Sequence, residues 1–498
     1  MKVKILFSFI FSALISSAVF GQARAPHSMY FMETIPQISQ FNPALQPRTN
    51  VYISLPGVGI DFHSDIAIKD VLQRHGDNYF TPVEDEFDYK KFYNATGKSA
   101  TMINVGVDID LLGFGFRTGK GYFSFGMSEH AGAKFALPTD LFKIPEKFFP
   151  DQSEFNLSPL RVEAKTYLQF RVGYSHQFNE KLTIGMNVKP LFGQMTATTK
   201  FDNFHLKTGI NEWIIESKGK IHTSAPVEII RDDEGKISVS EERLDELQDM
   251  IDAGEWAQLA NRYFFNGNNF GIALDLGAAY QITERLSVSA ALNNIGFIAW
   301  NRDLSGANFG GEFTFDNRTI DLNLADYLND NDKLNELLDE IGDDIFDDLE
   351  FQPYDGKFRT SPPPVLYAGA SYLFNSYLSA GFLSRTTFWQ NAVRQSFNLS
   401  VNLQPYSFVA LTTGATWQVK GNVYLGGGLT FFLGPLQIYL VSDYVPVRYS
   451  TLQYNDTDIP FIPERQKTIY ARLGFNLVFG KHGYRNRPML DTRGSSWQ

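Results

Sequence analysis

The sequence predicts an all-β fold, a transmembrane antiparallel β-barrel of about 14 strands. A secretory signal opens the chain, many segments alternate apolar and polar residues over about ten positions, and short turns alternate with long loops between these segments. The 498 residues include no Cys, which excludes disulfides. Beyond the signal no stretch approaches the length of apolar chain that a transmembrane helix needs, so we expect the mature chain to have none.

The N-terminus predicts a signal peptide over residues 1–21. Lys2 and Lys4 precede an apolar stretch from Ile5 to Ile15, and the residues up to Gly21 include the small ones that a signal peptidase requires. The apolar stretch is short for a membrane-spanning anchor, which is the alternative. We therefore expect cleavage after Gly21. No Cys follows the cut, so we expect no lipid anchor.

Alternation with a period of two identifies the strands. In 168–175, 270–277 and 469–479 one face is apolar and the other is polar or small, which suits a strand between lipid and lumen. We predict a barrel over residues 50–479, and the boundaries leave a count between 12 and 16 open. The predicted strands are 50–63, 101–117, 121–136, 165–178, 181–199, 268–281, 285–300, 364–374, 376–388, 394–404, 406–417, 421–433, 435–445 and 466–479.

The connections between these strands alternate in length. Tight turns separate longer connections, of which the longest are 64–100, 137–164, 200–267 and 301–363. Short turns on one side and long loops on the other are typical of outer-membrane barrels, and an even strand count places both termini on the periplasmic side. Residues 480–498 would then form a periplasmic tail. Residues 240–263 and 326–350 are predicted to make two extracellular loops partly helical.

Six charged side chains fall on the polar phase of their strands and are therefore predicted to face the lumen. Such charges either shape a pore or brace a closed interior, and the sequence leaves both possibilities open. The six residues are Arg171, Lys189, Asp275, Arg385, Asp443 and Arg472.

Sequence motifs for catalysis, metals or cofactors are absent from the chain. There is no Gly-x-Ser-x-Gly elbow and no His-Glu-x-x-His motif, and the eight His residues are scattered. The acidic run 326–350 raises the question of calcium, but it lacks an EF-hand spacing, and a solvated loop face is the favoured interpretation. The formal net charge of −11 argues against nucleic acid as a partner. We expect no enzyme and no cofactor, with outer-membrane lipid around the barrel.

Several short motifs resemble those of known outer-membrane families. Phe41-Asn42-Pro43-Ala44 resembles the Asn-Pro-Ala signature of barrels similar to the long-chain fatty-acid transporter. Related 14-stranded barrels in Bacteroidota include partners of type IX secretion. The stretches 292–300, 434–443 and 472–480 resemble an uncharacterised Bacteroidota outer-membrane family. The resemblance implies a β-barrel in the outer membrane.

The same resemblance implies a role for the N-terminus. The fatty-acid transporter family places its N-terminal segment inside the barrel as a hatch, so residues 22–49 would form a plug, with Asn42, Pro43 and Ala44 in its turn. An ordinary turn at the start of the first strand is the alternative, because Asn-Pro favours turns anyway.

Two functions remain open. The first is binding or passage of an apolar small molecule through the plugged lumen, which would require an apolar pocket and a lateral gap in the wall. The second is a non-catalytic scaffold, in which loops 200–267 and 301–363 hold a secreted or surface protein.

Overall fold

The computed structural model describes most of the chain between residues 27 and 480. The predicted signal peptide lies outside the described residues, as do the tail beyond Gly480 and almost all of the predicted helix at 326–350. The gaps within 27–480 are 72, 76–77, 81–86, 97–98, 144–152, 210–211, 226–227, 232–236, 241, 260, 263–264, 266, 317–349, 390–391, 420–422, 446–449, 455–456 and 463–466.

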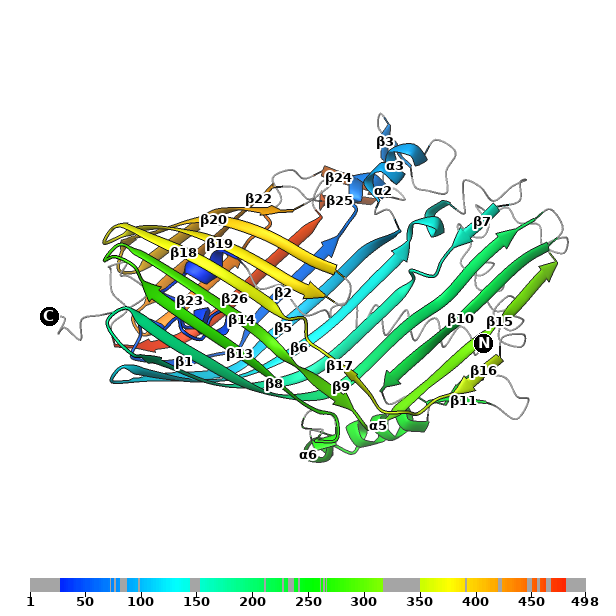
Figure 1. Ribbon diagram of the computed structural model, residues 1–498, viewed down its shortest axis with the longest axis horizontal. Helices are drawn as coiled ribbons and strands as arrows, with labels where there is room; N and C mark the ends of the chain where they lie inside the picture. The colour runs from blue at the N-terminus through cyan, green and yellow to red at the C-terminus, as the bar shows by residue number, and fades with distance from the viewer. Residues whose placement is uncertain are drawn as a thin grey trace.

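Fourteen antiparallel wall strands close into a barrel, with β1 and β2 forming one interrupted strand (Figure 1). Each wall strand pairs with the next one along the chain, and β26 pairs with β1 and β2 to complete the ring. Closure satisfies the backbone hydrogen bonds without water, as lipid requires. The predicted fold class and strand number are confirmed. The wall strands are β1 (Val51–Ser54), β2 (Gly57–Ser64), β5 (Ala100–Thr118), β6 (Gly121–Pro138), β8 (Arg161–Gln177), β9 (Leu182–Thr208), β13 (Phe270–Gln281), β14 (Leu286–Trp300), β18 (Val365–Asn375), β19 (Leu378–Trp389), β20 (Ala392–Tyr406), β21 (Val409–Gln418), β22 (Val423–Leu433), β23 (Leu436–Ser442) and β26 (Thr468–Phe479).

The outer face of the wall is an apolar band with aromatic residues at both edges. Along β13, exposed Phe270, Ile272 and Leu276 alternate with buried Gly271, Ala273 and Asp275. Apolar side chains that face outward around a closed sheet define a transmembrane barrel. Exposed aromatics near the short turns include Tyr280, Phe374, Tyr406, Phe408 and Phe479, and those near the opposite, long-loop end include Phe270, Phe388 and Trp417.

One part of the sheet continues beyond the membrane band. β9 has 27 residues, whereas a tilted strand needs only about 9–11 to cross lipid. Its first part, up to Phe192, pairs with β13, and its last part, from Thr196, pairs with β10 (Glu212–Ser224). The sheet then continues through β15 (Leu304–Asp316) to β16 (Glu350–Pro353), as Figure 1 shows at the long-loop end. β7 (Ser153–Asn156) pairs with the end of β9, and β17 (Phe358–Thr360) pairs with the end of β14.

This extension corrects the sequence analysis, which assigned 200–267 and 301–363 to loops. Both ranges contain long strands, β10 and β15. Outside the membrane neither face of a strand contacts lipid, so the alternation that identifies a wall strand is lost. β10 shows this in its run of Trp213, Ile214 and Ile215 followed by Lys218 and Lys220.

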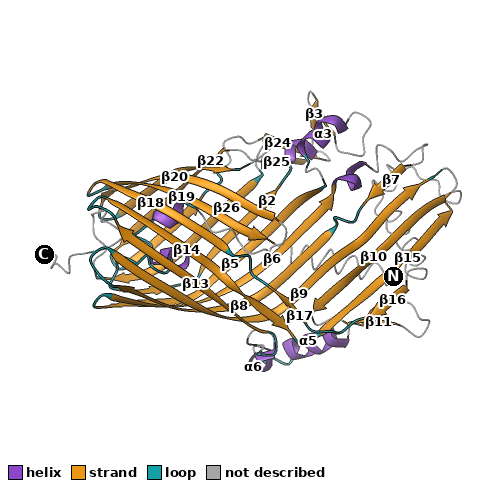
Figure 2. Cartoon of the chain, viewed as in Figure 1, coloured by secondary structure: helices purple, strands orange, loops and turns teal. Residues whose placement is uncertain are grey.

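Short helices and hairpins complete the described part of the chain (Figure 2). Two 3-10 helices, η1 (Ser28–Phe31) and η2 (Pro36–Gln40), precede the wall. α5 (Glu242–Asp252) and α6 (Trp256–Leu259) fall within the stretch predicted to be helical. Among the described residues, no helix is long and apolar enough to span a membrane. The other elements are α2 (Ile68–Val71), β3 (Gln73–His75), β4 (Asn78–Phe80), α3 (Tyr89–Ala95), η3 (Thr139–Lys143), β11 (Glu228–Arg231), β12 (Ile237–Ser240), β24 (Ser450–Tyr454) and β25 (Thr457–Ile462).

Candidate functional site

Residues 27–49, which we call the N-terminal segment, lie inside the barrel with η1 and η2 enclosed by the wall (Figure 1). Their apolar side chains pack against one part of the wall, formed by β13, β14, β18, β19 and β23, which we call the packed side. Burial of this apolar surface holds the segment in place. The cluster joins Met29, Tyr30, Phe31, Met32, Ile35, Ile38, Phe41, Ala44 and Leu45 to Ala279, Ala291, Val365, Tyr367, Leu383, Tyr439 and Val441.

Glycines in the wall allow this close approach. A Cβ at Gly185 in β9 would overlap the backbone of Pro43 and Ala44. A Cβ at Gly277 in β13 would meet the side chains of Asn42 and Pro43. The Asn42-Pro43-Ala44 turn therefore lies directly on the wall at positions that only glycine leaves open.

Asn42 ties this turn to the wall by hydrogen bonds. Its amide nitrogen donates to the carbonyl of Ala290 at 3.2 Å and to the hydroxyl of Tyr30 at 3.0 Å. Its amide oxygen accepts from the backbone N–H of Ala44 at 2.9 Å. Asn293 of β14 holds the preceding residues, because it donates to the carbonyl of Phe41 at 2.9 Å.

The start of the N-terminal segment is held by Asp443, just after β23. Its buried carboxylate accepts hydrogen bonds from the backbone N–H groups of His27 and Ser28. The His27 ring lies with Nε2 2.7 Å from the Ser396 hydroxyl and Nδ1 3.4 Å from the Asp443 carboxylate.

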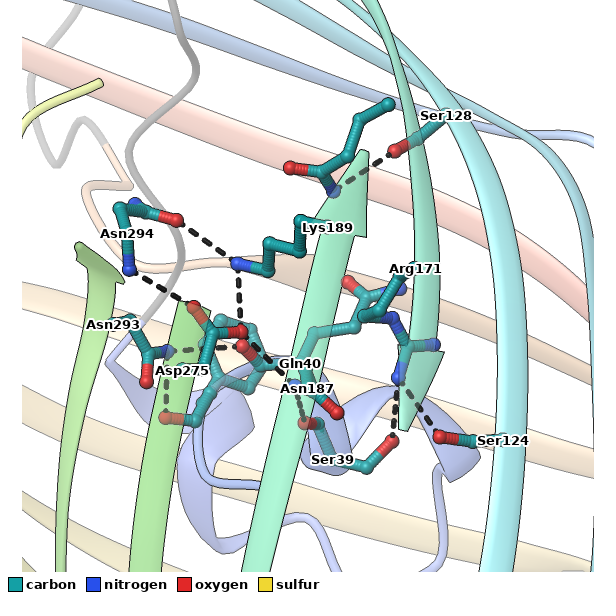
Figure 3. A network of polar contacts seen from close by, with 12 residues as sticks. Ser39, Gln40, Ser124, Ser128, Arg171, Asn187, Lys189, Asp275, Asn293 and Asn294 are labelled. Atoms are coloured by element: carbon teal, nitrogen blue, oxygen red, sulfur yellow. Dashed lines mark hydrogen bonds and ion pairs between the residues drawn. The ribbon is translucent and has the colours of Figure 1, made fainter. Parts of the chain in front are cut away.

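A second carboxylate, Asp275, organises a polar network between the wall and the N-terminal segment (Figure 3). Asp275 is fully buried and forms an ion pair with Lys189 at 2.7 Å. It also accepts from the side chain of Asn187 and the backbone N–H of Asn294, both at 2.9 Å. Asn187 donates in turn to the Ser39 carbonyl at 3.2 Å, which connects the network to the segment.

Arg171 approaches the same part of the segment from β8 (Figure 3). Its guanidinium donates to the hydroxyls of Ser39 at 3.4 Å and Ser124 at 3.1 Å. Within the part of the chain that the structure describes, no carboxylate lies within ion-pair distance of Arg171. Arg171 and Asn187 thus meet at Ser39, and Asn187 connects Ser39 to the Asp275–Lys189 ion pair.

The other two luminal arginines lie elsewhere. Arg472 of β26 is buried and forms an ion pair with Asp110 of β5. Arg385 of β19 lies over the ring of Tyr367, with 5.8 Å between the guanidinium carbon and the ring centroid. All six charged residues singled out in the sequence are buried in the structure, and five of them contact the segment or line the cavity described next.

A cavity of about 480 Å³ adjoins the N-terminal segment. Most of its lining comes from strands outside the packed side, such as β2, β5, β6, β8 and β26, but Val365, Tyr367 and Arg385 of β18 and β19 also line it. Its lining is rich in charged and amide side chains, with a minority of apolar ones. The lining includes Asp61, Asp65, Asp108, Asp110, Arg171, Lys189, Arg385, Arg394, Arg472, Gln37, Gln40, Gln169, His27, His63 and His130, together with Leu112, Met127, Val365, Val393 and Val419.

Two stacked tyrosines lie between this cavity and the short-turn end of the barrel. Tyr52, which lines the cavity, stacks on Tyr122 with ring centroids 6.4 Å apart, and both are buried against Val478. Arg117 lies over the Tyr122 ring at 5.2 Å and donates to the Pro47 carbonyl at 2.6 Å. The same arginine thus fixes both the aromatic pair and the end of the N-terminal segment.

The wall ladder is interrupted where the cavity meets β1 and β2. Ser54 pairs with Gly113 and Gly57 pairs with Asp110, and no pairing joins the residues between them. Pro56 has no N–H to donate, and β5 carries an irregularity between Asp110 and Leu112 on the facing strand. Leu112 lines the cavity while its side chain is also exposed.

Sequence reasoning missed the inward residues of β2, β5 and β6. Asp108 and Asp110 are two positions apart and so share a face, as do Ser128 and His130. The irregularity after Asp110 shifts the alternation, which concealed this pattern. No group of three or more His, Asp or Glu residues is placed to hold a metal among the described residues.

The closed wall, the apolar outer band and the occupied lumen define a transmembrane β-barrel of the outer-membrane type. The chain belongs to the family of unknown function DUF5723, whose model matches residues 43–443. No curated protein matches the chain significantly.

Among solved structures, the chain is similar to the toluene transporter TbuX of Ralstonia pickettii, with 11% identity, a TM-score of 0.42, and coverage of 92% of this chain and 99% of that one. It is also similar to the toluene transporter TodX of Pseudomonas putida, with 11% identity, a TM-score of 0.40 and coverage of 89% and 93%. A FadL homologue of Pseudomonas aeruginosa matches with 12% identity, a TM-score of 0.38 and coverage of 92% and 97%. At these scores no property of those proteins follows for this chain.

Proposed function

We propose that the protein binds small molecules in the luminal cavity and passes them across the outer membrane, with the N-terminal segment acting as a plug. The observation that carries this proposal is the asymmetry of the lumen. The segment is packed against one part of the wall, and beside it lies a cavity large enough for a ligand, lined mostly by strands outside the packed side.

The lining favours an amphipathic ligand over a plain hydrocarbon. Charged and amide groups need hydrogen-bonding partners when water is displaced from them. The apolar side chains of Leu112, Met127 and Val365 offer an apolar surface to the apolar part of the same ligand.

Two routes out of the cavity fit this geometry. One passes the Tyr52–Tyr122 pair to the short-turn end, and the other is lateral, through the interrupted ladder at Pro56. The first requires two rings to separate, whereas the second requires movement of Leu112, whose side chain already lies between cavity and exterior.

Ligand binding is tested by filling the cavity. Protein extracted from its native outer membrane should carry a bound amphipathic small molecule in native mass spectrometry. Gln169→Trp places a large ring in the cavity and should abolish that adduct, whereas Gln352→Trp, on the exposed strand β16, should retain it. A wild-type protein without a small-molecule adduct, or an adduct that survives Gln169→Trp, would contradict the proposal.

A scaffold role is the second candidate, and the extramembrane sheet of β9, β10, β15 and β16 favours it. Such a sheet exceeds what a small-molecule path requires. Co-purification of a stoichiometric protein that depends on this sheet, with no small-molecule adduct, would support the scaffold role instead.

A further inference from the structure

A serine, a histidine and an aspartate form a hydrogen-bonded chain on the cavity wall. Ser128 Oγ lies 2.9 Å from His130 Nε2, and His130 Nδ1 lies 2.6 Å from Asp108 Oδ1. The barrel register produces this arrangement, because Asp108 of β5 is the direct cross-strand partner of His130 of β6. Ser128 stands two positions before His130 on the same face.

The position of the proton on the His130 ring follows from its two hydrogen-bonding partners. An ionised carboxylate only accepts, so Nδ1 carries the proton that is donated to Asp108. Nε2 is then left to accept the hydroxyl proton of Ser128. The His130 ring also stacks on Tyr167, with centroids 5.0 Å apart and an interplanar angle of 22°, which fixes its plane.

Two other histidines line the cavity, but neither has a serine and a carboxylate at such short distances from its two ring nitrogens. His27 Nε2 contacts Ser396, but its Nδ1 is 3.4 Å from Asp443, whose carboxylate also holds the backbone of the N-terminal segment. His63 has a threonine on Nδ1 and Asp65 on Nε2. Of the three, His130 alone has a serine and a carboxylate both within 3 Å of its two ring nitrogens.

The site is accessible and has a donor for a developing negative charge. Ser128, His130 and Asp108 all line the cavity. Gln169 is the cross-strand partner of Ser128 on β8, and its amide nitrogen lies 3.4 Å from the Ser128 hydroxyl. An amide N–H beside the nucleophile is suited to stabilise the oxyanion of a tetrahedral intermediate.

We propose that Ser128, His130 and Asp108 form an acyl-transfer site that hydrolyses small carboxylic esters within the lumen, an activity beyond the proposed transport. Ser128 Oγ attacks the ester carbonyl carbon and its proton passes to His130 Nε2. The carbon–oxygen bond to the alkoxide breaks, and the alkoxide leaves as the alcohol with that proton. Water then attacks the acyl-serine through the same base, which releases the carboxylic acid and restores the Ser128 hydroxyl.

In this scheme Ser128 and His130 are catalytic residues and Asp108 is a positioning residue. The net change is ester plus water to acid plus alcohol, with no oxidant and no metal consumed. The site could not be predicted from the sequence, because its residues match no linear motif and come together only through the pairing of β5 with β6.

The test uses the full-length protein in detergent micelles and a biotinylated fluorophosphonate, followed by peptide mapping. The wild type should be labelled at Ser128 and should release p-nitrophenol from p-nitrophenyl butyrate. Ser128→Ala should abolish both signals, and His130→Gln should slow labelling by about 100-fold or more. Ser396→Ala, at the weaker His27 cluster, is the matched control and should label like the wild type.

The Asp108→Asn variant distinguishes a role of Asp108 in positioning His130 from a purely structural role. Asparagine keeps the size of the side chain and can still hydrogen-bond, but it removes the charge, so labelling should slow strongly while the heat-stable folded band on a gel persists. A merely structural Asp108 would leave the labelling rate unchanged. Absence of labelling in the folded wild type, or labelling that persists in Ser128→Ala, would overturn the proposed activity. Neither result bears on the transport proposal, which the small-molecule adduct tests independently.

Discussion

The two sides of the N-terminal segment differ in what holds them. The packed side is apolar and dense, with glycines that bring the segment onto the backbone of the wall. The side that faces the cavity is polar and hollow, with ion pairs such as Arg472–Asp110 in the cavity lining. The first side fixes the segment, and the second leaves room for a ligand. The segment can therefore be firmly seated while a cavity remains beside it.

The two sides should also differ in their sensitivity to substitution. Removing water from charged groups is costly, so those on the hollow side are stable only as long as each has its partners. Burial of apolar surface, by contrast, does not depend on any single contact. Substitutions on the hollow side should therefore have the larger individual effects.

Breaking the ion pair on the hollow side should have the largest effect. Arg472→Met leaves Asp110 buried without its partner, which typically costs about 3–5 kcal/mol. Urea unfolding in detergent measures the free energy of unfolding. The double substitution Arg472→Met with Asp110→Leu removes both charges and should recover most of the loss. No loss in the single variant would show that Asp110 is not held by Arg472.

Gly185→Ala tests the packed side. The new Cβ meets the backbone of Pro43 and Ala44, which cannot move as a flexible side chain would, so we expect a loss of about 2–3 kcal/mol, within the range for overpacking. Gly310→Ala is the control, because its Cβ has no neighbour closer than 3.8 Å. Equal unfolding free energies for the two variants would argue against the seating of this turn on the wall.

Asn42→Ala should cost less than Gly185→Ala, about 1–2 kcal/mol, because it removes hydrogen bonds to Tyr30 and Ala290 but adds no clash. Protease sensitivity of the N-terminus should rise with it. An Asn42→Ala variant as stable as the wild type would mean that apolar packing alone holds the turn.

The extramembrane sheet should be the least sensitive region. Lys207 and Glu216 pair across β9 and β10, and this hydrogen bond lowers the pKa of the Glu216 carboxyl. Its stabilising effect is present at neutral pH and would disappear only as the pH falls below the ordinary range for glutamate. Because both groups are open to solvent, Glu216→Gln should leave the unfolding midpoint at pH 7 unchanged. A clear shift of that midpoint would show that the sheet contributes to barrel stability.

The Tyr52–Tyr122 pair tests whether the cavity is closed toward the short-turn end. Tyr52→Ala with Tyr122→Ala should raise the conductance of the barrel in a planar bilayer, because the cavity then opens toward the short-turn end. Phe397→Ala with Trp417→Ala removes a stacked pair whose Trp417 is exposed, and it should leave the conductance at the wild-type level. Unchanged conductance in the tyrosine variant would place the seal elsewhere.

Much of this architecture was predictable because lipid imposes a pattern. Alternating residues such as those of 270–277 predicted the wall, its closure and its 14 strands. β10 and β15 were not predictable in the same way, since water on both faces removes the pattern. The cavity residues required knowledge of cross-strand register. Nothing in the local sequence indicates that Asp108 faces His130, or that Tyr52 lies against Tyr122.

The difference between the two sides of the lumen is most directly tested by cysteine accessibility, which the chain permits because it has no native Cys. Gln169→Cys lies on the cavity wall and Ala279→Cys lies beneath the N-terminal segment. With a small water-soluble methanethiosulfonate reagent, the cysteine at position 169 should react readily and that at position 279 should stay unmodified until the protein is denatured. Equal reaction at both positions in the folded barrel would contradict both the packing of the segment over Ala279 and the open cavity beside Gln169.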